Sequence, residues 1–187
     1  GGKDHSPGTN YFNTAFVIST NGEMVFKQVK SVPIQFFKDG LPATEQKVWE
    51  SPWGKIGICI CYDLSYTRVT DELVRQGAQM LIVPTMDVAD WGLHQHELHA
   101  RVAPVRAAEY GIPIFRVASS GISQGVDRTG RVRSSAPFEG EGEMLFLGVN
   151  LSAHRRGSLP LDRWLAPFCV VVTGGFVVWL AVETLMK

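Results

Sequence analysis

The sequence has few cysteines and no surplus of charge of either sign. Three cysteines in 187 residues are too few and too scattered for a disulfide framework. Eighteen basic side chains are balanced by eighteen acidic ones, so no basic excess exists to neutralise phosphates. The composition therefore gives no electrostatic reason to expect a nucleic-acid partner. The length allows one domain with a full apolar core.

The first ten residues, GGKDHSPGTN, lack three features of an ordinary protein start. They contain no initiator methionine, no apolar stretch of a signal peptide and no apolar periodicity. We therefore expect residues 1–12 to be either a disordered lead-in or the cut edge of a longer protein.

Charge is also absent from a long stretch near the other end. No residue from Trp164 to Val182 is charged, and Asp162–Arg163 and Glu183 flank this run. Its nineteen residues, at a rise of about 1.5 Å each, make a helix of about 28 Å, close to the hydrocarbon thickness of a bilayer. A buried core helix is the alternative, but such helices are rarely apolar on every face. The pattern predicts a transmembrane helix and tail at 164–187, after a linker at 153–163.

Between these ends, short apolar runs alternate with helical patterns. Phe12–Ile18 and Met24–Val29 predict a hairpin, because Asn21–Gly22 suits a type I′ turn with positive φ at both central residues. Trp53–Cys61 predicts a strand with its isoleucines on one face. Further strands are expected at 79–85, 112–119 and Glu143–Leu151, a hairpin turn at Asp127–Gly130, and helices at Thr67–Gln76 and Glu97–Tyr110, the second interrupted or kinked at Pro104. Helices in the middle and hairpins at both ends predict an α/β fold with a mixed sheet.

The segment GICICYDLSY, at 57–66, ends an apolar strand in polar residues. Cys59 and Cys61 would point to the same face if the strand continued, because side chains at i and i+2 do so. A strand-to-helix elbow at Tyr62–Asp63 would instead expose Cys61 at the sheet edge where catalytic groups collect in α/β folds. Cys61 is thus a candidate nucleophile, although a buried, inert cysteine remains the alternative on spacing alone.

This segment resembles the nucleophile region of the nitrilase (carbon–nitrogen hydrolase) superfamily, in which an apolar strand ends in Cys-Tyr-Asp/Glu. The resemblance runs from about Asn13 to Leu151. NTAFVISTNGEMVFKQVK is similar to the hairpin that ends at the catalytic lysine, which aligns with Lys30 and, as a second choice, with Lys27. RAAEYGIP and SSGISQGVDRTGRV, at 106–113 and 119–132, resemble further family segments.

The resemblance implies part of an αββα sandwich, with residues 13–152 as the C-terminal part of a catalytic domain. It also implies Cys61 as nucleophile and Lys30 as a catalytic ammonium, and it implies no cofactor and no metal. A thiolate can attack an acyl carbon, while a nearby ammonium lowers the pKa of the thiol and holds the developing oxyanion.

Two departures from the family pattern stand out. The family needs a glutamate base upstream of the lysine, but the only acidic residue before Glu23 is Asp4. We therefore expect the sequence to be the C-terminal part of a larger protein. In addition, the loop after Lys30 offers Gln35, with Asp39 slightly further on, where many members have a glutamate. Gln35 can hydrogen-bond there but cannot take a proton.

A membrane span is typical of one branch of the superfamily, the apolipoprotein N-acyltransferases. AHRRGSLPLDRWLAPF resembles that branch's exit into its last helix, and MDVADWGLHQHELHARVAPVRAAE loosely resembles its pocket segments. The resemblance implies a phospholipid acyl donor, a diacylglyceryl-cysteine lipoprotein acceptor, and a catalytic domain on the periplasmic side of a bacterial inner membrane. The residues that we expect to contact substrate are Gln35, Tyr62, Asp63, Trp91 and His99.

Three other functions remain open. A membrane-tethered amide hydrolase would resolve the thioester with water instead of an amine. A metal-binding module could use His94, His96 and His99, although the i, i+3 spacing of the last two differs from the i, i+4 spacing of zincins. A non-catalytic remnant would account for the missing glutamate if the 187 residues were the whole protein.

Overall fold

The computed structural model describes residues 2–5, 11–140, 142–151 and 156–186. Within these residues the strands form two sheets. The smaller sheet has the order β1 (Gly2–His5), β2 (Tyr11–Ile18), β3 (Met24–Val29), all antiparallel. The larger sheet has the order β4 (Val48–Ser51), β5 (Gly54–Ile58), β6 (Met80–Thr85), β7 (Ile114–Ala118), β8 (Ser123–Val126), β9 (Val132–Ala136).

The larger sheet is mixed, as the sequence predicted. Its central strands β5, β6 and β7 are parallel, and the flanking strands pair antiparallel with them. The helical elements are η1 (Cys61–Ser65), α1 (Thr67–Arg75), η2 (Ala89–Trp91), α2 (Gly92–Ala100), α3 (Val102–Tyr110) and α4 (Asp162–Leu185). The parallel strands bring the ends of β5, β6 and β7 to one edge of the sheet, where ligand sites of α/β folds form.

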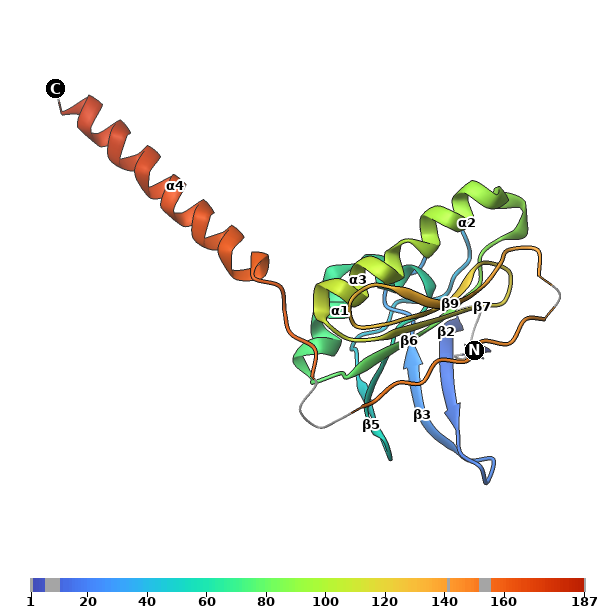
Figure 1. Ribbon diagram of the computed structural model, residues 1–187. Coiled ribbons are helices and arrows are strands. Elements are labelled where there is room, and N and C mark those ends of the chain that lie inside the picture. Colours follow the sequence, from blue (N-terminus) through green and yellow to red (C-terminus); the bar gives the residue numbers. More distant parts are fainter. Residues whose placement is uncertain (1, 6–10, 141, 152–155, 187) are drawn as a thin grey trace.

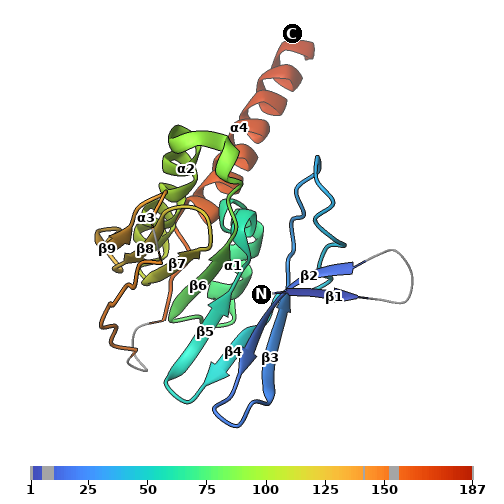
Figure 2. The ribbon, with the colours of Figure 1, turned by 90° about the vertical axis from the view of Figure 1, so that its right-hand side faces the viewer.

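Alternation along the strands builds two apolar layers. One face of the larger sheet contributes Cys59, Leu81 and Val83 to a core that also contains side chains of α1 and α3. The opposite face contributes Ile56 and Ile58, and it packs against side chains of the smaller sheet. The described part of the chain is therefore layered helix, sheet, sheet, and Figure 2 shows the two sheets beside each other. The α/β expectation is confirmed.

The first hairpin forms where predicted, but its turn is not type I′. Among the described non-glycine residues, positive φ occurs only at Cys61 and Glu139, so Asn21 does not have it. Gly22 alone in the turn does, at +81°. Gly22 N–H bonds Ser19 O at 3.0 Å, and Ser19 N–H bonds Glu23 O at 2.8 Å. A loop with one left-handed glycine is the usual longer alternative to the two-residue turn.

The segment expected to form one helix over 97–110 forms two helices, and the first of them begins before residue 97. Helix α2 starts at Gly92, and the chain breaks at Arg101 before α3. The break lies three residues before Pro104, which has no N–H to donate to the carbonyl of Ala100. Gly111 closes α3 in the left-handed region, at φ +67°. Strand β4, which pairs with β5, was not predicted.

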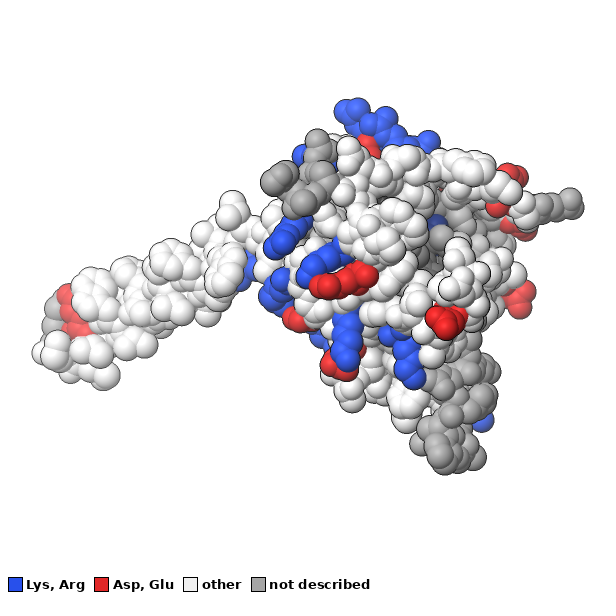
Figure 3. All heavy atoms as spheres, turned by 90° about the horizontal axis from the view of Figure 1, so that it is seen from below, with Lys and Arg blue, Asp and Glu red and all other residues white. Residues whose placement is uncertain are grey.

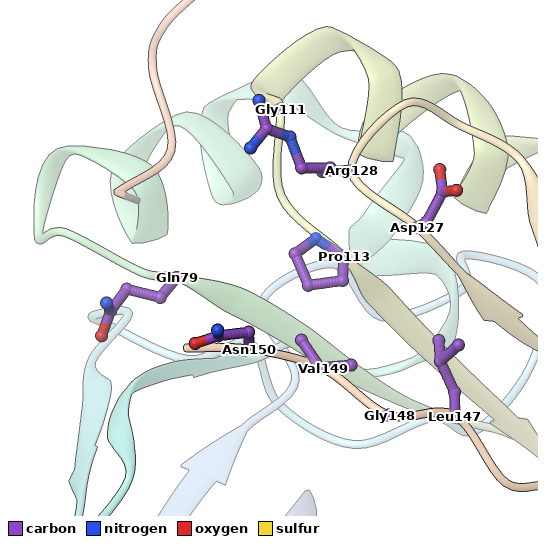
Figure 4. A pocket seen from close by; sticks show the side chains of 9 residues that line it. All are labelled: Gln79, Gly111, Pro113, Asp127, Arg128, Leu147, Gly148, Val149 and Asn150. Atoms are coloured by element: carbon purple, nitrogen blue, oxygen red, sulfur yellow. The ribbon is translucent and has the colours of Figure 1, made fainter. Parts of the chain in front are cut away.

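The expected strand Glu143–Leu151 is wrong, because residues 142–151 form no strand in the structure. Leu147 lies against Gly125 of β8, while Leu151 lies against Gly54 of β5. This segment thus crosses the sheet face instead of pairing at an edge (Figure 4). In contrast, the expected lead-in contains strand β1, which pairs with β2 through its backbone. Residues 1 and 6–10 of that segment lie outside the described residues.

Helix α4 leads away from the domain (Figure 1). It is long and apolar enough to cross a membrane, and none of its most apolar stretch is buried. On the face seen in Figure 3, charged side chains occur only at its two ends. Its first turn is tied to the domain, because Arg163 contacts Asp71 of α1 at 2.8 Å and Glu109 of α3 at 2.6 Å. Residues 153–155 of the expected linker lie outside the described residues, as does residue 152, the last of the expected catalytic domain.

Candidate active site

Cys61 lies at a sharp change of chain direction after β5. Its φ is +52°, a left-handed conformation that non-glycine residues adopt rarely and at some energetic cost. The side chain consequently packs with Ile58 and Ile60, whereas Cys59 lies in the core on the opposite face. The two cysteines therefore do not share a face. The elbow that the sequence suggested is present, and Cys61 is the cysteine that reaches the sheet edge.

Asp63 holds this elbow in place. Its buried carboxylate accepts hydrogen bonds from the backbone N–H groups of Ile60 at 3.0 Å, Ser31 at 3.0 Å and Val32 at 2.7 Å. Burial raises the pKa of Asp63, against the lowering effect of these hydrogen bonds. Its oxygens bond backbone groups, and Asp63 does not line the cavity described below, so in this structure it positions the elbow.

Lys30 is buried at the end of β3, with 2% of its side chain exposed. Its Nζ lies 2.5 Å from Asp39 Oδ2. Asp39 also accepts hydrogen bonds from Asn13 Nδ2 at 2.8 Å and from Ile34 N–H at 2.9 Å. Burial would raise the pKa of Asp39, but the hydrogen bonds, led by that from Lys30, lower it. Lys30 is therefore paired with the carboxylate of Asp39, and not with Gln35, which the sequence offered first at the family's glutamate position.

A cavity of about 270 Å³ opens above Cys61. Four of the five residues that we expected to contact substrate line it, namely Gln35, Tyr62, Trp91 and His99. Its rim is aromatic and apolar: the ring centroids of Tyr62 and Tyr66 lie 5.0 Å apart, and those of Phe37 and Trp91 6.3 Å apart. The larger sheet thus carries a hollow with a thiol at its base and an apolar entrance.

His99 belongs to a polar cluster that sequence reasoning did not find. His99 Nδ1 lies 2.7 Å from Asp87 Oδ1, and Arg116 Nη2 lies 2.6 Å from Asp87 Oδ2. Asp87 and Arg116 are buried. Burial would raise the pKa of Asp87, but the hydrogen bond from His99 and the charge of Arg116 lower it to about 2. A charged residue inside the apolar run IPIFRVAS was the available signal, because a buried arginine requires an acidic partner.

The thiol of Cys61 is a weaker acid here than an ordinary cysteine thiol. Burial raises its pKa and outweighs the lowering effect of the Lys30 charge, while the Asp87 carboxylate raises it further. Lys30 therefore acts on the thiol in the expected direction, but burial outweighs its effect and the pKa of Cys61 is raised overall. Burial raises the pKa of Cys59 well above its ordinary value, which makes that thiol inert.

The three histidines of the suggested metal module lie in different environments. His94 is exposed, His96 is fully buried, and His99 lines the cavity. A different set, Cys61, Asp87 and His99, offers ligand atoms within 4.8 Å of one another. The Arg116 guanidinium already binds Asp87 and lies 3.2 Å from His99 Nδ1. A second cation at this point would be repelled, so the cluster does not suit a metal.

A second hollow, of about 160 Å³, lies at the opposite edge of the sheet. Gln79 and Pro113, which precede β6 and β7, line it together with Leu147 and Asn150 of the crossing segment (Figure 4). Cys61 and the other expected site residues do not line it. We therefore place the candidate active site at the Cys61 cavity.

The arrangement of Cys61, Lys30 and the elbow agrees with the comparison to known families. The family model of the carbon–nitrogen hydrolases matches residues 2–155. The chain belongs to this family. The chain is also similar to a deaminated glutathione amidase of Dictyostelium discoideum, with 26% identity over 163 residues that cover 78% of this chain and 56% of the amidase.

Two further similarities extend this result. An apolipoprotein N-acyltransferase of Geobacter metallireducens is 23% identical over 147 residues, which cover 68% of the chain and 28% of the transferase. Saccharomyces cerevisiae Nit3, of the nitrilase superfamily, has a similar fold with a TM-score of 0.60 and 24% identity, covering 71% of the chain and 51% of Nit3. The chain thus spans about half or less of the length of these proteins.

Proposed function

We propose that this carbon–nitrogen hydrolase family member transfers acyl groups. Cys61 takes a fatty acyl group from a phospholipid as a thioester, and then passes it to the N-terminal amine of a diacylglyceryl-cysteine lipoprotein. Lys30 holds the oxyanion that develops on the acyl carbon in each step. Helix α4 anchors the domain in a bacterial inner membrane, with the cavity on the periplasmic side.

The apolar rim of the Cys61 cavity is the observation that carries this proposal. Large apolar side chains at and beside the cavity are left in contact with solvent. Phe36, which lines the cavity, is 90% exposed; Phe37, which contacts the lining residue Trp91, is 54% exposed; and Met86, whose carbonyl contacts Cys61 Sγ, is 66% exposed. An amidase that acts on small polar molecules has no need of such a surface, whereas an acyl chain would cover it. The unburied apolar helix α4 supports the same assignment, because both substrates reside in a bilayer.

The test uses the full-length protein, reconstituted in phospholipid vesicles and mixed with a synthetic diacylglyceryl-cysteine peptide. We expect the mass of the peptide to rise by one fatty acyl group, and Cys61→Ala to abolish this gain. Cys169→Ala is the matched control, because Cys169 is an exposed residue of α4. Unchanged peptide mass with the full-length wild-type protein contradicts the proposal.

A membrane-tethered amide hydrolase is the second candidate, and the similarity to the deaminated glutathione amidase favours it. Both candidates share the Cys61 thioester and differ in the group that resolves it. The same preparation incubated with small amides would then release ammonia, and the lipopeptide would stay unmodified. Measuring both products in parallel decides between an amine and water as the acceptor.

A further inference from the structure

The backbone of Cys61 is in a costly conformation that its surroundings must maintain. At φ +52° this non-glycine residue lies in the left-handed region, which persists only where the neighbouring structure fixes it. Cys61 is the first residue of η1, and Asp63 holds the beginning of this turn through the backbone N–H groups of Ile60, Ser31 and Val32. The last carbonyls of a helical turn have no partner inside it. A second group is therefore needed to hold the end of η1.

Arg106 of α3 is the side chain that holds this end. Its Nε donates to Leu64 O at 3.1 Å, and its Nη2 donates to Ser65 O at 2.9 Å. Its Nη1 donates to Glu109 Oε2 on the same helix. All three nitrogens of the planar guanidinium are thus engaged, which fixes η1 relative to α3.

Glu109 connects this contact to the beginning of α4. Its other oxygen, Oε1, lies 2.6 Å from Arg163 Nη2. Arg163 is in the first turn of α4, and its Nε lies 2.8 Å from Asp71 Oδ2 of α1. Between 14% and 20% of the Arg106, Glu109 and Arg163 side chains is exposed, so solvent screens them less than it screens a surface ion pair. Polar contacts therefore run without a gap from α4 to the turn that carries the nucleophile.

These contacts are separate from the groups that face substrate. Arg106, Glu109 and Arg163 are not among the described residues that line the Cys61 cavity. A change at these positions therefore removes no contact with an acyl group. A role in packing alone predicts that their loss lowers the stability of the fold and leaves the behaviour of the thiol unchanged.

We propose that Arg106 is a positioning residue of the Cys61 elbow, and that Glu109 and Arg163 make its position depend on α4. The elbow then has two supports, Asp63 at its start and Arg106 at its end. A movement of the first turn of α4 relative to α3 would shift Glu109, and through Arg106 it would reach the nucleophile. The inference rests on the proposed function only in that Cys61 is the nucleophile.

Two rates measured on Cys61 in the full-length protein test the inference, with Cys169→Ala as background and peptide mapping to identify the modified residue. Arg106→Lys keeps the charge but lacks the planar fork that bonds both carbonyls. The elbow should relax, and the thiol, which belongs to a residue only 5% exposed, should gain access to solvent. Alkylation by iodoacetamide, at a pH near the ordinary thiol pKa of about 8.5, should become at least about threefold faster. Acyl-thioester formation from phospholipid should become slower by about tenfold or more, because a small displacement of a reacting group is costly.

Cys59 reports on folding in the same experiment. It is fully buried, so an unfolded variant would expose both cysteines, whereas a relaxed elbow exposes Cys61 alone. Arg101→Lys, at an exposed position just before α3, is the matched control and should change neither rate. If Arg106→Lys does not fold, Glu109→Gln takes its place.

Arg163→Gln tests the connection to α4. It should accelerate the alkylation of Cys61. It should also accelerate hydrogen exchange at the amides of Asp63 and Tyr66, which bond Ile60 O at 3.0 Å and Asp63 O at 3.1 Å.

Two results would overturn the inference. One is an unchanged or slower alkylation of Cys61 in folded Arg106→Lys, or in Glu109→Gln in its place. The other is faster exchange confined to residues 157–162 in Arg163→Gln. Absence of acyl transfer together with faster alkylation would count against the proposed function alone, since alkylation needs no lipid.

Discussion

Lys30 and Asp39 form an ion pair at 2.5 Å, with 2% and 13% of their side chains exposed. A lysine that is withdrawn from water in this way requires a counter-charge, because an isolated buried ammonium is strongly disfavoured. Asp39 supplies it from a loop that returns to β2, where Asn13 donates to the same carboxylate. The position of the Lys30 ammonium therefore depends on a residue nine positions further along the chain.

Asp39→Asn should destabilise the fold by about 3 kcal/mol, because it leaves a buried ammonium without its partner. Urea unfolding in detergent at neutral pH measures this value. Glu45→Gln is the control, since Glu45 and Lys47 form an ion pair at 2.6 Å with 63% and 59% of their side chains exposed. Removing that pair should cost less than about 1 kcal/mol. Equal effects of the two substitutions would show that burial does not strengthen the Lys30 pair.

Lys30→Met should lower the rate of acyl-thioester formation on the order of 10²-fold or more, as the loss of an oxyanion donor does. Methionine is chosen because it keeps the length of the buried stem without the charge. Lys27→Met, at an exposed position of β3, should change the rate little. Intact mass of the chain after incubation with phospholipid gives both rates. The opposite order of effects would assign the catalytic ammonium to Lys27.

Cys61 should react with iodoacetamide as the pH is raised, whereas Cys59 in the folded chain should not. Cys61 lines the cavity, while Cys59 is fully buried and has a pKa raised well above its ordinary value. In the acyl assay, Cys61→Ser should abolish adduct formation and Cys59→Ala should retain most of it. Peptide mapping after partial labelling checks the first statement. Modification of Cys59 ahead of Cys61 would contradict the assignment of the elbow.

Asp87 should give the fold a stability that disappears in acid. Its pKa is about 2 in the fold and about 3.9 in an unfolded chain. A group with a depressed folded pKa stabilises the fold fully above the unfolded value, and this contribution is lost as the pH falls from about 4 to about 2. Asp87→Asn should therefore be less stable than wild type by about 2 kcal/mol at pH 6. Unfolding curves measured at pH 6 and pH 3 should show a smaller difference in unfolding free energy between wild type and Asp87→Asn at the lower pH. An equal difference at both pH values would contradict this prediction.

Arg163→Gln should loosen the connection between α4 and the domain. Arg163 contacts Asp71 and Glu109, and nearby backbone N–H groups of Gly157 and Ser158 bond the carbonyls of Ala78 and Tyr110, each at 3.1 Å.

Hydrogen exchange at residues 157–162 should speed up in this variant while β6 and β7 keep their protection. Arg156→Gln, at an exposed position just before this segment, serves as the control. Unchanged exchange in Arg163→Gln would mean that the backbone bonds hold the segment without the arginine.

Much of the site framework could be predicted from the sequence because it depends on local patterns. The alternation of apolar side chains in Trp53–Cys61 located β5, although the strand ends at Ile58, three residues earlier than predicted. The uncharged run from Trp164 located α4, because nineteen successive uncharged residues are typical of a helix long enough to span a bilayer. The family resemblance added Lys30 and Cys61, and their roles stay predictions until they are tested.

The sequence pattern predicted the wrong structure where contacts with residues distant in the sequence decided the conformation. The run Glu143–Leu151 was predicted to be a strand, but it crosses the sheet face, where Leu147 and Leu151 lie against Gly125 and Gly54. Strand β1 has no apolar pattern, but its backbone pairs with β2. Asp39 was second to Gln35 in sequence register, yet the return of its loop gives it the contact with Lys30.

The sequence by itself determined that an apolar strand leads into the Cys61 segment and where an apolar helix leaves the domain. Only the tertiary structure decided which groups surround the thiol. Asp87, His99 and Arg116 come from the end of β6, from α2 and from β7. Arg116 is the one charged residue of β7, and no periodicity in the sequence marks Asp87 or His99 as its partners. They become a cluster because parallel strands bring their ends to one edge, where a buried charge is stable only with the partners that folding places beside it.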